Sequence, residues 1–249
     1  MEENPVNNEI EKFIEFLGTS LQRVDNLAFS EGQNNDQQLL TYKKILLMSF
    51  IDCMAKTIYP SHKNRKRFTS FMSNFTDWDE SDQDRVSLLH LRECLNQNPE
   101  PKWSDLRQYV NELFGCWDSS SLIPIDEDPK WEDIQKCSPN SSEDAIFKVN
   151  NKPISLEQLK HKNLIYLNRC NLVHEFREAG QGRDTNQDKI HYRHTLQAEN
   201  PWDLIYPYGF FKTQCDYAIE NLQTYYKENR LDPYKVFNFG AFWISELNL

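Results

Sequence analysis

Apolar residues spaced three and four positions apart recur along most of this chain, and this pattern constrains its fold more than any other feature. Such spacing is typical of amphipathic helices, which bury one face against a neighbour. It predicts helices over about 8–28, 39–59, 64–76, 85–97, 103–115, 155–178 and 209–228. We therefore expect an all-α helical bundle that forms a single domain over residues 1–249.

The segment 116–154 interrupts this pattern. It is rich in Ser, Asp and Pro, so we expect an irregular, loop-rich insertion, ending in a small hairpin that turns at Asn150 and Asn151. Residues 190–196 alternate between apolar and polar and predict a short strand, the other part of a small β element. The C-terminal tail, residues 231–249, is rich in aromatic residues, and we expect it to pack back onto the body.

A helix-start signal precedes the longest helical segment of the second half. Ser155 and Gln158 have the spacing of a capping box, in which each side chain bonds the backbone N–H of the other residue. The box predicts that a long helix begins here. Its expected end is near Glu178, before Gly180.

The scarcity of glycine and the spacing of the cysteines exclude several kinds of site. There are seven glycines and no glycine-rich phosphate-binding motif. The six cysteines are spread along the chain without a Cys-x-x-Cys pair, so a zinc knuckle or a redox pair is not expected. The sequence therefore predicts neither a metal site nor a cofactor.

The net charge of −10 limits how this chain could contact a nucleic acid. Proteins that grip nucleic acids over a broad surface are usually basic, so any contact with RNA would be local. The best basic stretch contains Lys63, Arg65 and Arg67, which are candidate substrate-binding residues. The alternative is that they form the solvated start of a helix.

The longest apolar stretch, from Ile45 to Ile58, is too short to span a bilayer and contains Asp52 and Lys56. The N-terminal residues are acidic and rich in Asn, unlike a signal peptide. We expect a cytoplasmic protein with no membrane association and with its cysteines as free thiols.

The long helix carries Arg169 and His174, separated by four residues. A histidine titrates near neutral pH and can transfer a proton, and an arginine presents a planar fork to phosphate oxygens. Five residues of a regular helix turn about 500°, so these two side chains should point about 140° apart. His174 falls on the apolar stripe of Leu156 and Leu167, and we expect it to face a packed neighbour.

Two other histidine pairs compete with this one. Arg85 and His90 have the same spacing, so the spacing alone is weak evidence, and we expect that pair to be structural. His191 and His194 could offer two metal ligands, but the sequence supplies no third ligand nearby.

Several polar residues could support Arg169 and His174. Asn171 and Glu175 lie beside them in the sequence. Asp52 lies inside an apolar helix, where a carboxylate needs a partner, and it could orient Arg169. The alternative is that Arg169 forms a structural ion pair with Glu175 or Asp52 and that His174 is a core or interface residue.

The segment Asn168-Arg-Cys-Asn-Leu-Val-His-Glu175 resembles the motif helix of the HEPN superfamily, whose active members carry an Arg and a His four to six residues apart. In many members a polar residue directly follows the Arg; here Cys170 follows it and Asn171 comes one later. The resemblance implies a HEPN-like helical bundle and a metal-independent endoribonuclease, with Arg169 and His174 as catalytic residues.

The same resemblance implies partners. HEPN ribonucleases are usually dimers and occur in toxin–antitoxin and antiviral defence systems, so RNA, a second copy and an antitoxin or other protein are the expected partners. One His per chain supplies an acid or a base, and a twofold dimer would supply both. The alternative is a non-catalytic helical module that binds a protein or a nucleotide.

Overall fold

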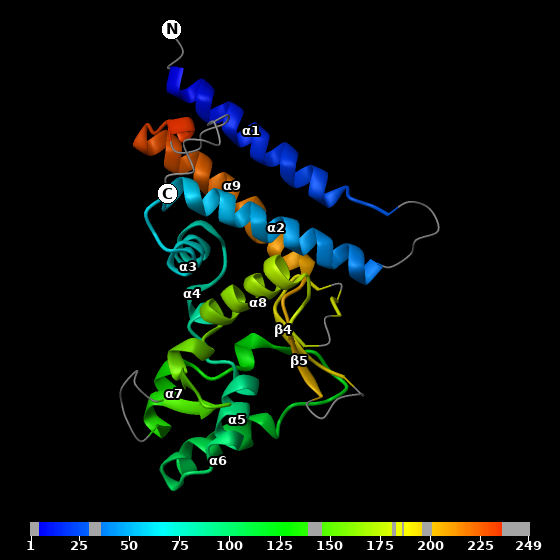
Figure 1. Ribbon diagram of the computed structural model, residues 1–249, viewed down its shortest axis with the longest axis vertical. Helices are drawn as coiled ribbons and strands as arrows, with labels where there is room; N and C mark the ends of the chain where they lie inside the picture. The colour runs from blue at the N-terminus through cyan, green and yellow to red at the C-terminus, as the bar shows by residue number, and fades with distance from the viewer. Residues whose placement is uncertain are drawn as a thin grey trace.

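The computed structural model describes residues 5–29, 36–138, 146–180, 183–185, 187–195 and 201–235. The chain is elongated and mostly helical, with a long-helix bundle at one end and a smaller helical part at the other (Figure 1). The predicted mostly helical fold, with its small β element, is confirmed. The predicted tail is described only as far as residue 235, and the rest of it lies outside the described residues.

The bundle consists of long helices whose apolar faces meet in one core. They are α1 (Pro5–Asp25), α2 (Asp36–Ile58), α3 (Asn64–Phe75), α8 (His161–Glu175) and α9 (Tyr208–Asn229). α1 and α2 pack against α9, and α8 packs against α2 and α3 (Figure 1). Phe13, Leu47 and Phe211 are fully buried in this core. Except for α8, the bounds lie close to the predicted ranges because each helix follows its own apolar stripe.

A second hydrophobic cluster fills the smaller part. It brings together α5 (Leu88–Gln97), α6 (Ser104–Phe114), α7 (Trp131–Cys137), β2 (Ile146–Val149), β3 (Lys152–Ser155) and the 3-10 turn η3 (Leu156–Leu159). Trp103, in the 3-10 turn η1 (Pro101–Trp103), and Phe147 lie at its centre, with ring centroids 4.6 Å apart. The segment 116–154, expected to be irregular with a hairpin at its end, thus contributes α7 and the first strand of the hairpin to a core that it shares with α5 and α6.

The hairpin turns where the sequence predicts. Asn150 and Asn151 both adopt left-handed backbone conformations, with φ of 50° and 63°. Asn tolerates this region better than most residues, and two successive positive φ values suit the right-handed twist of a two-residue hairpin.

A small antiparallel sheet lies beside the bundle, with strand order β1-β4-β5. Its strands are β1 (Ile123–Pro124), β4 (His191–His194) and β5 (Trp202–Ile205). The predicted strand at 190–196 corresponds to β4, whereas no pattern predicted β5. Short turns complete the described chain: α4 (Glu80–Gln83), η2 (Ile125–Glu127) and η4 (Pro233–Lys235).

The capping box forms, but the long helix does not begin there. Gln158 Oε1 accepts from Ser155 N at 2.8 Å, yet the box opens only η3. The chain is then extended at Lys160, and α8 begins at His161. The cause is non-local: residues 159–161 bond residues 85–87, through Ser87 N to Leu159 O at 3.0 Å and His161 N to Arg85 O at 3.1 Å.

The end of α8 also differs from the prediction. The helix stops at Glu175, because Phe176 adopts a left-handed conformation with φ of 54° and its N–H bonds the carbonyl of Asn171. The motif residue His174 therefore lies in the last turn rather than in the middle of a longer helix.

No helix within the described ranges has the length and apolar character needed to cross a membrane. All six cysteines are present as free thiols, as predicted.

Candidate functional site

The candidate site lies at the C-terminal end of α8, where the helix packs against α2 and α3. We call it the Arg169 cluster: Asp52 from α2, Arg65 from α3, and Tyr166, Arg169 and His174 from α8. Each side chain belongs to a helix predicted from the sequence, but their meeting depends on how the helices pack.

Asp52 is the partner of Arg169. Arg169 Nε donates to Asp52 Oδ2 at 2.8 Å, and Arg169 Nη2 donates to the same oxygen. The arginine is buried, with 9% of its surface exposed. Burial raises the pKa of Asp52 above its ordinary value, because the lost hydration outweighs the stabilisation that Arg169 provides. The Asp52–Arg169 pair was one of the two ion pairs considered from the sequence.

His174 lies beside the same guanidinium, with Arg169 Nη1 at 3.0 Å from His174 Nε2. Because a guanidinium can only donate, Nε2 accepts, which describes a neutral imidazole with its proton on Nδ1. The predicted angle of about 140° does not keep the two side chains apart, because their ends meet. An arginine side chain is long enough to reach a group on another face of the same helix, which Cα angles alone do not capture.

The expectation that His174 faces a packed neighbour is also wrong for a single chain, since its side chain is exposed. The apolar stripe continues past the packed part of α8. Leu167 is 53% exposed and Phe176 67% exposed, and these residues flank the histidine in the sequence. His174 thus lies in an accessible, partly apolar surface.

The basic stretch approaches this cluster. The Arg65 guanidinium lies 5.3 Å from the ring centroid of Tyr166, and that of Arg169 lies 6.0 Å from the same ring. Arg67 donates to His62 O at 2.8 Å, and its positive charge offsets part of the rise that burial causes in the pKa of Asp52. Lys63 is exposed and immediately precedes α3.

The sequence did not single out Tyr166. Its spacing of three residues before Arg169 could have identified it, because residues three apart on a helix are neighbours.

Asn171 and Glu175 contact other groups. The carbonyl of Asn171 accepts the capping N–H of Phe176. Glu175 Oε2 accepts from Arg177 Nε at 2.6 Å, and both of these side chains are exposed. Glu175 therefore pairs with Arg177 and not with Arg169.

A second cluster of polar groups lies at the opposite end of α8. We call it the Asp128 network: Asp128, His161, Tyr192, Ser87 and His90. Asp128 Oδ2 accepts from His161 Nε2 and from Tyr192 Oη, each at 2.6 Å. Ser87 Oγ lies 2.8 Å from both Tyr192 Oη and His90 Nδ1.

The Asp128 network connects the two parts of the molecule. Asp128 Oδ1 also accepts from Leu88 N at 2.8 Å, at the start of α5, and Arg85 Nη1 donates to the Asp128 carbonyl at 2.6 Å. Arg85 and His90, the competing pair, therefore both contact this network and do not bond each other as Arg169 and His174 do. No local pattern predicts the network, because its members come from four separate segments.

His191 and His194 have local roles. His191 bonds Lys189 O at 2.7 Å and Thr185 Oγ1 at 3.0 Å, and the His194 ring packs edge-on against Trp202. In the part of the chain that the structure describes, no group of three or more His, Cys, Asp or Glu side chains could hold a metal ion.

No protein-family model matches this chain, and comparisons with curated proteins and with solved structures found no match. A function for the Arg169 cluster is therefore argued from its chemistry and its geometry.

Proposed function

We propose that this chain is a metal-independent endoribonuclease of the HEPN kind, which acts as a homodimer with Arg169 and His174 as its catalytic residues. One observation carries the proposal: an exposed histidine lies 3.0 Å from an arginine that is itself held by a carboxylate. A proton-transferring group and a phosphate-binding group thus share one accessible place.

The proposed reaction needs only these groups. A phosphate oxygen replaces His174 Nε2 as the acceptor at Arg169 Nη1, and the freed Nε2 takes the proton of an RNA 2′-hydroxyl. The 2′-oxygen then attacks the adjacent phosphorus. The bond from phosphorus to the 5′-oxygen breaks, and the departing oxygen takes a proton from the second His174, which acts as the protonated imidazolium and becomes neutral. The products are a 2′,3′-cyclic phosphate and a 5′-hydroxyl.

Arg169 is suited to the charge that develops on the phosphate. A guanidinium has five N–H donors, so its bonds to Asp52 and His174 leave donors over for phosphate oxygens. Asp52 fixes the plane of the guanidinium in advance, which reduces the reorganisation needed during the reaction. Arg65 and Arg67 lie on the adjacent helix and would contact the RNA backbone there.

The proposed dimer follows from the need for two imidazoles. One His174 cannot be the base and the acid in the same step, and a twofold axis would bring a second one. The exposed side chains of Leu167 and Phe176 support an interface beside His174, because exposed large apolar groups are typical of interaction surfaces.

The test is cleavage of mixed single-stranded RNA in EDTA by the wild type, His174→Ala and Arg169→Ala. Each variant should lose about 100- to 10,000-fold in rate, the range typical of a lost acid–base or charge-stabilising group. Arg23→Ala, an exposed change on α1, is the matched control and should cleave like the wild type. Equal cleavage by all four proteins would exclude the proposed roles.

The second candidate function is a non-catalytic helical module that binds a protein or nucleotide partner. The buried Asp52–Arg169 pair favours it, because such a pair also serves as a structural contact. An inert wild type on every RNA tried would favour this function. A role in defence or growth arrest, with an antitoxin as partner, belongs to the first proposal.

A further inference from the structure

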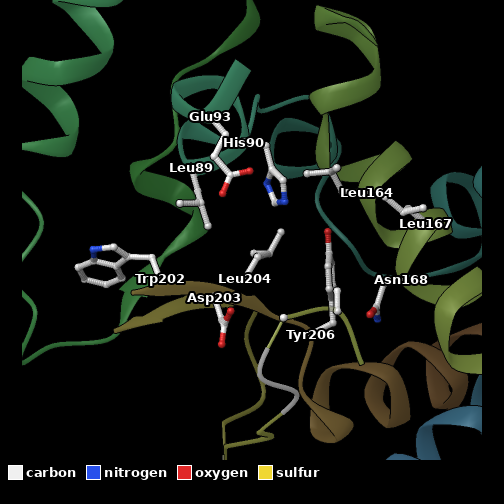
Figure 2. Close-up of a pocket in the computed structure, with 12 residues that line it drawn as sticks. Leu89, His90, Glu93, Leu164, Leu167, Asn168, Trp202, Asp203, Leu204 and Tyr206 are labelled. Carbon is white, nitrogen blue, oxygen red and sulfur yellow. The ribbon is translucent and has the colours of Figure 1, made fainter. Parts of the chain in front are cut away.

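A cavity of about 360 Å³ lies between α5, α8 and β5, at the junction of the two parts of the molecule. Its size is within the range of small-molecule sites. Apolar side chains form much of the wall. They are Leu89, Leu164, Leu167, Trp202 and Leu204. The polar lining comes from His90, Glu93, Asn168, Asp203 and Tyr206 (Figure 2).

The charged groups of this lining have one sign. Glu93 and Asp203 carry carboxyl groups, and none of the residues that line the cavity, all within the described ranges, is Lys or Arg. The Asp203 carboxylate lies against Gly180, whose φ of 67° and lack of a Cβ allow this close approach. The cavity therefore favours a cation over an anion.

His90 adds a hydrogen-bond acceptor. The hydroxyl proton of Tyr192 is donated to Asp128, so Tyr192 Oη can only accept from Ser87 Oγ, and the hydroxyl of Ser87 is the donor of that bond. In that arrangement His90 Nδ1–H donates to Ser87 Oγ, and every donor of the chain points toward the carboxylate. Nε2 of the neutral imidazole is then unprotonated, and Figure 2 shows this ring pointing into the cavity.

Asn168 lines the α8 side of the cavity and is 4% exposed. Its Nδ2 has no hydrogen-bond partner among the described residues, but this atom is closed off from the open space, and its amide points away from His90 and Glu93 (Figure 2). The polar contacts for a ligand therefore come from Glu93 and His90.

We propose that this cavity binds a small organic ammonium compound with an apolar or aromatic body. The ammonium donates to Glu93 and to His90 Nε2, and the body packs on Leu89 and Trp202. No residue of the Arg169 cluster lines the cavity, so the proposal does not depend on ribonuclease activity.

The test is calorimetric titration of the full chain with four probes of similar size. 2-Phenylethylamine and phenylalaninamide, which both carry the ammonium, should bind saturably. 2-Phenylethanol and phenylacetate, which lack the ammonium, should bind at least about 10-fold more weakly. Binding of the alcohol as tight as that of the amine would overturn the proposal, as would no binding of either amine.

Two variants assign the contacts. Glu93→Gln should weaken both amines about 10- to 100-fold, whereas the matched control Glu112→Gln, on the exposed face of α6, should not. Equal affinities in Glu93→Gln and Glu112→Gln, with both folded by circular dichroism, would contradict this assignment.

Discussion

The two ends of α8 carry similar chemical groups in opposite environments. At the N-terminal end, His161 bonds Asp128, and both side chains are fully buried. At the C-terminal end, Arg169 bonds Asp52 and His174, and the histidine is exposed. Each end pairs a carboxylate from another segment with a basic side chain of the helix.

The two ends differ in whether their polar groups can still bond a molecule from solution. The Asp128 carboxylate already accepts from His161, Tyr192 and the N–H of Leu88, with no surface left for a substrate. The Arg169 cluster opens to solvent at His174. A carboxylate paired with a basic side chain can thus stabilise the fold where it is buried and remain accessible to a substrate where it is exposed.

The largest expected effect is on stability at the buried end. Asp128→Ala removes the acceptor of three buried donors, and we expect the free energy of unfolding to fall by about 3–5 kcal/mol. Urea denaturation followed by circular dichroism measures the change. Asp128→Asn keeps the shape and should be less harmful. A loss below about 1 kcal/mol for Asp128→Ala would mean that the network does not join the two parts.

A pH effect of intermediate size is expected from His90. Burial lowers the pKa of His90 to about 4, because it disfavours the charged imidazolium. The unfolded chain binds this proton near pH 6.5, so the unfolded state gains stability as the pH falls from about 6.5 toward about 4. We expect this effect of His90 to lower the free energy of unfolding by about 3 kcal/mol as the pH approaches 4.

The measurement compares urea midpoints of the wild type and His90→Gln at neutral pH and at about pH 4.5. Other groups titrate in the same range, so the difference between the two proteins isolates His90. The variant should lose less stability than the wild type on acidification. Parallel losses would show that His90 is as hydrated as an ordinary histidine.

The smallest effects are expected at the open end. Asp52→Asn leaves the buried Arg169 without a carboxylate and should lower stability by about 1–2 kcal/mol. His174→Ala, at an exposed position, should change it by less than about 0.5 kcal/mol. The same urea experiment measures both. A cost for His174→Ala that matches that of Asp128→Ala would remove the distinction between the two ends of the helix.

Much of the local structure could be predicted from the sequence. The apolar periodicity located the long helices, and the pair Asn150-Asn151 located the hairpin turn. These features depend on residues a few positions apart, so a short window of sequence contains their cause. The residues of the candidate site, Arg169, His174 and Asp52, could also be proposed, because their types suggest a chemistry.

What the tertiary structure decided depends on contacts between distant segments. The capping box at Ser155 could not start α8, because residues 159–161 bond the chain at 85–87. The Asp128 network and the cavity beside His90 join segments that no local pattern connects. Likewise, the sequence determined that Asp52 lies on one helix and that Arg169 and His174 lie on another. Only the packing of these helices determined that the three side chains meet and that His174 remains exposed, because neighbouring elements decide which side chains are buried and which can touch.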